Sequence, residues 1–578
     1  MPAETGRASL KGKGGRKTNI SGNRDSVESF VVVFLFFLLL GLEAEAFVIP
    51  TGSMAPTLMG RHKEVVCPEC GSDFAVNADA EVEIPGTQIV AGTCVNCRYR
   101  MPIGEEPNFQ GDRIYVMKTP ITLPFLPELG RIDLNRWDVT VFKLPEKPEV
   151  RYIKRMVGMP GEVVRILRGD IWTRPLNDKN APFKRAIRPL KHQDAMQILV
   201  YDDTHRAKSL ANDLAWTRWS VPEGWQPGDV GIYHTKPSID WKELRYRHLV
   251  PDLVQWAAIG ENQPLPHAPR STLITDFYSY NTELTADALE LAKDSHKAWS
   301  QTNWVGDLTL EFDLDVTTKA GEVRIDLVKA GVTNRCVIDL DDETVTLWRG
   351  DERIAGPLPA GDLSKGRRAI SFANVDDRLT LKIDGRLPCG EGVSYVPGEA
   401  ICPTAEDLQP VGVATRGAEV SVGGLVIKRD IYYTRTPSQA DLSHFDDKVH
   451  PYAFDPVATF DWLADPSRFS EFADIAPKDF EIRPGHYMML GDNSPWSRDG
   501  RDWNRDDQKV PGSPSKGWDD SGRETWEVPE MLLIGKAFCV YWPHLTPFGP
   551  KIKVGSHPRL RDVRIPARPS LERMRWIR

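Results

Sequence analysis

Hydrophobic residues form one unbroken run near the start of the chain and short alternating segments further on. The run FVVVFLFFLLLGL lies within residues 27–49. A helix over this segment extends about 35 Å at about 1.5 Å per residue, enough to cross a hydrocarbon core about 30 Å thick. The pattern therefore predicts a transmembrane helix over residues 27–49.

The same run has a second interpretation, because its strictly apolar part, residues 30–42, is short. Glu43 follows it, and Ala44-Glu45-Ala46 is similar to the cleavage site of a secretory signal. Cleavage after Ala46 would give a soluble exported protein. Glutamates at the outer edge of a span can reach the lipid headgroups, so we expect an uncleaved anchor.

Short segments in which apolar and polar residues alternate begin at Trp304. They include DLTLEFDLDV, EVRIDLVKA, RCVIDLDD and TVTLWRG, and Gly or Asp residues separate them. Alternation with period two and such turns predicts an antiparallel β-sandwich inside a large insertion, residues 171–430. The segment SFANVDDRLTLKIDG resembles laminin-G and concanavalin-like sandwiches, which implies binding of envelope carbohydrate. The alternative is a spacer that binds nothing, and it is favoured because no cluster of aromatic and acidic residues marks a sugar site.

The charges are unevenly distributed between the two ends and the body. Residues 1–26 carry six Lys or Arg against two acidic residues, and residues 551–578 carry nine against two. The basic start predicts a cytoplasmic N-terminus, with everything after Pro50 outside. The basic end is expected either to touch anionic headgroups or to be solvated. The net charge of -8 argues against a nucleic-acid partner.

Four of the eight cysteines form two C-x2-C pairs, Cys67 with Cys70 and Cys94 with Cys97. Four thiolates on two tight turns suit tetrahedral Zn²⁺, so residues 67–100 resemble a zinc ribbon. Four thiolates leave no position for a catalytic water, and the metal would be structural. The alternative is two disulfides in an oxidising compartment.

A candidate nucleophile and a candidate base come from two separate segments. Ser53 lies in IPTGSMAPTLMG, between two prolines, and a hydroxyl needs a base to become a nucleophile. The chain contains neither an H-E-x-x-H nor a G-x-S-x-G motif. Lys154 lies in RYIKRMVGMPGE, a predicted apolar strand in which burial would lower its pKa. The alternative is an exposed lysine on an edge strand.

Four blocks in order resemble bacterial type I signal peptidases. They are PTGSMAPTL (50–58), GDRIYVMK (111–118), YIKRMVGMPGE (152–162) and GDNSPWSRDGRDW (491–503), and VPEMLLIGKAFCVYWP is similar to the closing strand. The resemblance covers roughly residues 27–66, 108–172 and 480–545. It implies a mainly β catalytic domain and a serine endopeptidase with no catalytic cofactor.

The resemblance also implies roles for particular residues. Ser53 would attack the scissile carbonyl and Lys154 would take its proton, with Ser497 orienting the lysine. Thr51 would bind the oxyanion together with the Ser53 backbone N–H.

Two further pairs belong to the last block. Asp499 and Arg501 match a charged pair that shapes the site, although a surface ion pair of little energetic value is the alternative. Asp492 and Asn493 are expected to fix their loop by bonds from side chain to backbone.

These expectations define one organisation of the chain. In order, it has a cytoplasmic tail (1–26), a transmembrane helix (27–49), a first catalytic segment (50–66), a zinc ribbon (67–100), a second catalytic segment (101–170), the sandwich insertion (171–430), a third catalytic segment (431–548) and a basic tail (549–578). The function implied is removal of signal peptides from exported preproteins, at the outer side of the bacterial inner membrane. One alternative is a related peptidase that cleaves itself or a single partner. Another is an envelope-binding protein with an inactive peptidase scaffold.

Overall fold

The computed structural model describes most residues of the chain. They are 44–104, 106–118, 134–291, 301–363, 366–398, 401–436, 461–503, 526–542, 545–546, 551–552, 563–564, 568–569 and 574–577. The predicted mainly β architecture is confirmed. Strands dominate, and helices are short, as in α2 (Ala80–Glu83), α3 (Leu190–Ala195), α4 (Leu253–Gly260) and α5 (Ala286–Leu291).

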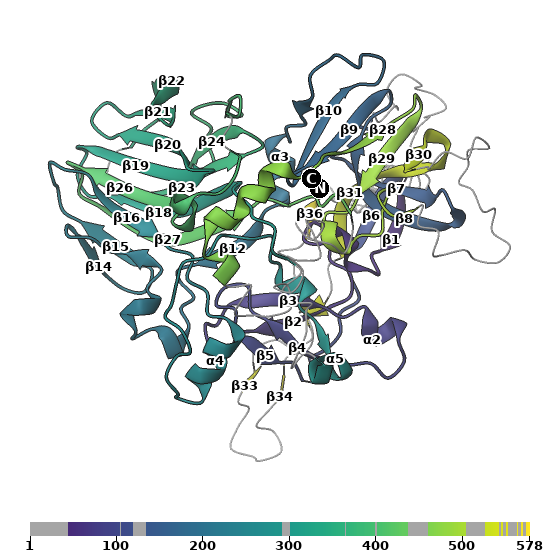
Figure 1. Cartoon of the computed structure of the whole chain (residues 1–578), viewed down its shortest axis with the longest axis horizontal. Helices are drawn as coiled ribbons and strands as arrows, with labels where there is room; N and C mark the ends of the chain where they lie inside the picture. Colours follow the sequence, from purple (N-terminus) through teal and green to yellow (C-terminus); the bar gives the residue numbers. More distant parts are fainter. Residues whose placement is uncertain are drawn as a thin grey trace, which may run out of the picture.

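An antiparallel eight-stranded sheet, called here the catalytic sheet, joins segments from both ends of the chain (Figure 1). Its order is β1 (Ala44–Val48), β6 (Arg113–Lys118), β31 (Leu533–Trp542), β7 (Val139–Leu144), β8 (Lys147–Gly158), β29 (His486–Leu490) and β30 (Glu527–Pro529). β36 (Arg575–Trp576) pairs with β31 at the side of this path. The basic C-terminal tail therefore returns to the sheet at these two residues instead of being wholly solvated.

A four-stranded sheet, called here the small sheet, follows the catalytic sheet along the chain, because β8 of the catalytic sheet leads directly into β9 of the small sheet. Its order is β11 (Lys184–Arg185), β10 (Asp170–Pro175), β9 (Glu162–Leu167) and β28 (Lys478–Glu481). The sandwich insertion was predicted to begin at residue 171, but residues 171–175 and 184–185 pair within the small sheet. The sandwich itself begins at β12 (Ile198–Asp202), which pairs with β27.

Two sheets form the sandwich, on the opposite side of the molecule from the catalytic sheet in Figure 1. The first contains β14 (Trp225–Pro227), β15 (Ile232–Thr235), β27 (Val420–Arg429), β18 (Leu308–Val316), β23 (Gly366–Val375), β24 (Arg378–Ile383) and β25 (Val393–Ser394), with β12 beside β27. The second contains β13 (Trp219–Ser220), β16 (Lys242–Tyr246), β26 (Val411–Arg416), β19 (Glu322–Lys329), β20 (Val332–Asp339), β21 (Thr344–Arg349) and β22 (Glu352–Pro359).

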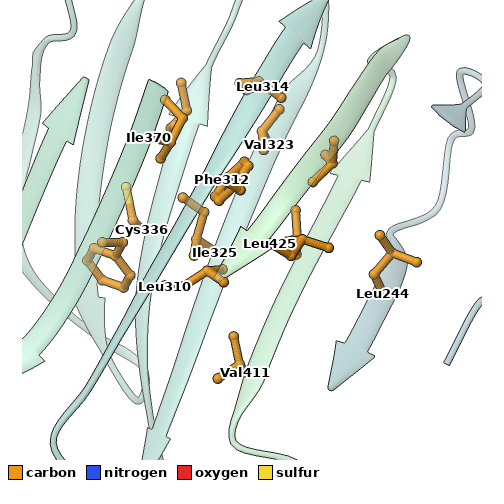
Figure 2. Close-up of a cluster of buried hydrophobic side chains, with 14 of the residues drawn as sticks. Leu244, Leu310, Phe312, Leu314, Val323, Ile325, Cys336, Ile370, Val411 and Leu425 are labelled. Atoms are coloured by element: carbon orange, nitrogen blue, oxygen red, sulfur yellow. The ribbon is translucent and has the colours of Figure 1, made fainter. Parts of the chain in front are cut away.

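The core between these two sheets follows from the alternation in the sequence. Every second side chain of β18, from Leu308 to Val316, is buried, because successive side chains of a strand point to opposite faces. Figure 2 shows Leu310, Phe312 and Leu314 meeting residues of the facing sheet such as Val323 and Ile325.

Two small sheets surround the cysteine pairs. One is the hairpin of β2 (His62–Val66) with β3 (Asp73–Asn77), and the other has the order β17 (Leu284–Thr285), β4 (Ile89–Thr93) and β5 (Arg100–Pro102). The predicted boundaries of this module, 67–100, are too narrow at both ends. β17 comes from the sandwich insertion, so the two insertions are joined by strand pairing.

The predicted transmembrane helix lies mainly outside the described residues, and its predicted C-terminal end is wrong. Residues 44–48 form β1, which pairs antiparallel with β6 from Ala44 opposite Met117 to Val48 opposite Arg113. The strand supplies the backbone hydrogen bonds that the edge of β6 requires. Within the described ranges, no helix has the length and apolar character needed to cross a membrane.

The remaining short elements lie in loops. They are the 3₁₀ turns η1 (Gly52–Met54), η2 (Lys208–Leu210), η3 (Leu214–Trp216), η4 (Ser279–Asn281), η6 (Ala405–Leu408), η9 (Pro466–Asp474), η10 (Ser494–Trp496) and η12 (Glu530–Leu532), and the pairs β32 (Leu545–Thr546) with β35 (Arg568–Pro569) and β33 (Lys551–Ile552) with β34 (Val563–Arg564). Of these, η1 and η4 carry or contact the candidate nucleophile.

Candidate active site

Ser53 lies on η1, the short turn that follows β1. Its neighbours Met54 and Ala55 are fully buried, and Ser53 itself is half-buried. The apolar neighbours anchor the turn in the core while leaving the hydroxyl at the surface of the catalytic sheet. This is the exposed but fixed loop that the sequence predicts.

Lys154 lies on β8, an interior strand of the catalytic sheet between β7 and β29. Its side chain is only 3% exposed, and Nζ lies 2.5 Å from Ser53 Oγ, within hydrogen-bond distance. The alternative of an exposed lysine on an edge strand is therefore wrong.

Burial shifts the proton equilibrium of this lysine. The pKa of Lys154 falls to about 8, first because burial penalises the ammonium form. The nearby carboxylates of Asp499 and Asp492 act in the opposite direction, and the charge of Arg501 acts in the same direction as burial. A lysine with a pKa near 8 has a substantial neutral fraction at neutral to mildly alkaline pH.

Asp499 and Arg501 form a fully buried ion pair with two contacts of 2.8 Å and 2.7 Å. The alternative of a surface ion pair is wrong. Burial alone would raise the pKa of Asp499, but Arg501 and the Gly491 N–H hold it below its ordinary value. The remaining donors of Arg501 bind Thr434 and Ser494, so the pair fixes the loop around it.

Asp492 has a different partner from the one expected. Its carboxylate pairs with Arg155, with Nε–Oδ1 and Nη2–Oδ2 distances of 2.7 Å and 2.6 Å, and both side chains are fully buried. Asn493 does bond to backbone, because its Nδ2 donates to the Gly52 carbonyl at 3.2 Å. Arg155 directly follows Lys154, so this ion pair ties the last block to the strand that carries the base.

Ser497 and Thr51 lie near the dyad, and among the described residues neither side chain is hydrogen-bonded to Ser53 or Lys154. Ser497 Oγ is buried and has no hydrogen-bond partner among the described residues. It lies so close to Gly491 that a Cβ there would be 2.1 Å away. Thr51 is exposed and its side chain does not cap η1. Their roles toward the lysine and the oxyanion stay predictions.

Three residues that the sequence did not single out contact either the nucleophile turn or the Asn493 side chain that binds it. Asp79 accepts a hydrogen bond from the Gly52 N–H at 3.1 Å. The ring of Tyr280 lies against Gly52, where a Cβ would come within 2.2 Å of it. Asn281 exchanges two amide hydrogen bonds with Asn493, at 2.7 Å and 2.8 Å. No motif marks these residues, since they lie in the insertions.

The four paired cysteines come together in a buried cluster. Their four sulfur atoms all lie within 4.8 Å of one another. The sulfurs of Cys67 and Cys97 are 3.6 Å apart, and so are those of Cys70 and Cys94. These separations are too long for disulfide bonds, whose sulfurs are about 2.05 Å apart. A tetrahedron with Zn–S distances of about 2.3 Å has sulfurs about 3.8 Å apart. The donor set therefore fits a zinc ion better than it fits disulfides.

Comparisons with known proteins bear on the N-terminal third of the chain. Residues 24–224 match the family model described as signal peptidase, peptidase S26. Signal peptidase I of Pseudomonas fluorescens is 30% identical over 136 residues, which are 24% of this chain and 32% of the relative. Signal peptidase I of Pseudomonas aeruginosa is 32% identical over the same shares of both chains. The chain thus spans about a third of the length of the curated relatives it matches.

Some solved structures are similar to part of the chain. A carbohydrate-binding module, CBM66 from Bacillus subtilis, matches 37% of this chain and 96% of its own, at 12% identity and a TM-score of 0.21. A Bacillus subtilis protein of unknown function with a galectin-like fold matches 41% of this chain and 98% of its own, at 10% identity and a TM-score of 0.24. At these scores the likeness carries no conclusion about the sandwich.

Proposed function

We propose that this chain, whose residues 24–224 match the signal peptidase family model, is a membrane-anchored serine endopeptidase that removes signal peptides from exported preproteins. The observation that carries the proposal is the 2.5 Å contact between Lys154 Nζ and Ser53 Oγ, made by a lysine that is almost wholly buried. A buried lysine of lowered pKa is the base that a serine hydroxyl requires.

The reaction begins with neutral Lys154 removing the proton from Ser53 Oγ. The oxygen attacks the scissile carbonyl, and the oxyanion that forms is stabilised by the Ser53 backbone N–H and the Thr51 hydroxyl. The lysine then gives its proton to the leaving amine, which leaves an acyl group on Ser53. A water molecule, deprotonated by neutral Lys154, hydrolyses this ester and restores the serine.

The buried Asp499–Arg501 pair helps to keep the pKa of Lys154 low enough for the lysine to act as a base. A lone buried carboxylate near Lys154 would hold the ammonium form and raise the lysine pKa. Because Arg501 binds Asp499 at both oxygens, the net charge near the base is close to neutral. Burial then dominates and favours the neutral amine.

The proposal also covers where the protein lies, which substrates it cleaves and which metal ion it holds. The apolar run in residues 27–49 would anchor the chain in the bacterial inner membrane with the catalytic sheet outside. A preprotein held by its own apolar signal would present its cleavage site close to this surface. Cys67, Cys70, Cys94 and Cys97 would hold one structural zinc ion, which takes no part in peptide hydrolysis.

The test is cleavage of a preprotein with an A-x-A site by the detergent-purified full chain. Ser53→Ala and Lys154→Met should each lower kcat by at least about a thousandfold, equivalent to about 4 kcal/mol of barrier. The matched control is Lys536→Met, and it should retain activity. Lys536 lies in the same sheet on β31, two strands from β8, and pairs with Asp138. Equal cleavage by all variants would reveal a contaminant and contradict the proposal.

Further outcomes of the same assay separate the alternatives. A peptidase that cleaves only itself or one partner would cut none of several unrelated preproteins. Its cleavage of itself or of that partner would still be lost in Ser53→Ala. An envelope-binding protein with an inactive scaffold would cut nothing while its sandwich retained a glycan.

A further inference from the structure

A cavity of about 320 Å³ lies where one end of the sandwich meets the small sheet, outside the candidate active site. Asp170 and Trp172 of β10 and Arg185 of β11 line it on one side. Lys329, at the end of β19, and Asp377, in the turn between β23 and β24, line it on the other. Its size is within the range of small-molecule pockets, which begins at about 300 Å³.

Charges of the two signs are balanced in this cavity. Four carboxylates and four basic side chains line it, namely Asp170, Asp307, Asp377 and Asp430 with Arg165, Arg168, Arg185 and Lys329. Arg185 lies 2.6 Å from Asp170 and 2.9 Å from Asp377, and Lys329 pairs with Asp307. Because the chain supplies these cations itself, the grouped oxygens of Asp170, Asp307 and Asp376 are poor ligands for a metal ion. A strongly charged organic ligand is also disfavoured.

Several buried polar atoms of the lining lack hydrogen bonds. Trp172 Nε1 is a donor with no hydrogen-bond acceptor among the described residues, and the carboxylate that Arg185 Nη1 faces, that of Asp307, is 3.7 Å away. Asp377 Oδ2 lies 2.9 Å from Arg185 Nε. Asp377 is 5% exposed. A buried donor without an acceptor destabilises the protein, so a partner that accepts from these donors and donates to the neighbouring carboxylates is favoured. A hydroxyl group does both.

The half-buried rings of Trp172 and Phe183 add apolar surface beside these polar atoms. From this combination we infer that the cavity binds a neutral polyhydroxylated ligand, a small carbohydrate. Its hydroxyls accept hydrogen bonds from Trp172 Nε1 and Arg185 Nη1 and can donate to the carboxylates of the lining, and its C–H faces contact the rings. Sequence reasoning missed the site because its residues come from seven separate segments between positions 165 and 432. The inference does not depend on peptidase activity.

The test is calorimetric titration of the full chain with glucose, galactose and N-acetylglucosamine, each as monosaccharide and disaccharide. At least one should bind with a dissociation constant in the millimolar range or tighter. Trp172→Phe keeps the ring but removes the N–H, and should weaken binding about fivefold to tenfold. Phe183→Ala should weaken it as well.

The matched control is Trp241→Phe, because Trp241 also lies near arginine side chains but does not line the cavity. Binding that Trp241→Phe weakens as much as Trp172→Phe, or that neither cavity variant changes, would overturn the inference. Absence of binding by all six sugars would overturn it too, since the cavity would then hold only water. Binding of the dipeptide Gly-Gly in place of the sugars would identify a zwitterion site and equally contradict it.

Discussion

The two members of the dyad are held in different ways. Lys154 belongs to an interior strand of the catalytic sheet, where β7 and β29 flank it on both sides. Ser53 belongs to a three-residue turn that lies outside any sheet. A strand inside a sheet fixes its side chains through its ladder of backbone bonds, whereas a short turn depends on whatever packs around it.

The contacts around the turn come from both the insertions and the last block. Asp79 follows β3 of the cysteine module, and Tyr280 and Asn281 come from the large insertion. Asn493, from the last block, completes the set: its backbone N–H donates to the Ser53 carbonyl at 3.1 Å. The blocks that resemble signal peptidases thus supply the chemistry, and the insertions share with the last block in holding the nucleophile in place. The insertions are therefore integral to the support of the active site.

The largest expected effect comes from breaking the support on the lysine side. Asp492→Ala leaves the Arg155 guanidinium buried without its carboxylate, and such a charge costs about 3–5 kcal/mol of stability. Urea unfolding should show this loss. Asp479→Ala is the matched control, because its pair with Arg165 is partly exposed and should contribute less than about 1 kcal/mol. Similar losses of stability in both variants would contradict the claim that the buried Arg155–Asp492 pair stabilises the strand that carries Lys154.

Metal removal tests the nucleophile side. If zinc organises the cysteine cluster, chelation loosens both Asp79 and the β4–β17 pairing that leads to Asn281. We expect kcat to fall about 10–100-fold, equivalent to about 1.4–2.7 kcal/mol, and to recover when zinc is added back. Elemental analysis should find one zinc per chain, and Cys67→Ser should lower that content. Full activity of the metal-free protein would show that the cysteine cluster does not support catalysis, and would contradict this prediction.

A single hydrogen bond gives the smallest of these effects. Asp79→Ala removes the acceptor for the Gly52 N–H, and kcat should fall about tenfold with little change in KM. Asp79→Asn keeps an oxygen acceptor and should lose less. Glu83→Gln, an exposed neighbour, should behave as the unchanged protein. If Asp79→Asn and Asp79→Ala lose activity equally, charge rather than the hydrogen bond is what matters.

Burial also makes Asp79 sensitive to pH. Burial raises its pKa to about 6, although the Gly52 N–H and Arg61 favour the ionised form. The carboxylate is therefore charged above about pH 6, where it binds the Gly52 N–H more strongly.

The sequence was sufficient for the local features and not for the distant contacts. Alternation predicted the strands of the sandwich, and the spacing of cysteines predicted their cluster, because both are properties of neighbouring residues. Ser53 and Lys154 were found because their segments resemble a known family. Asn281 and Asn493 are 212 residues apart, and no local pattern records that they meet. The end of the predicted helix failed because residues 44–48 pair with β6, a tertiary interaction.

The most direct test of the central claim is the dependence of kcat/KM on pH for cleavage of a preprotein. Neutral Lys154 is the active form, so kcat/KM should rise with pH through a midpoint near 8. About a tenth of the enzyme would be active at pH 7 and about nine-tenths at pH 9. A midpoint near 10.5, the ordinary value for lysine, or a rate that does not change with pH would contradict Lys154 as the buried base.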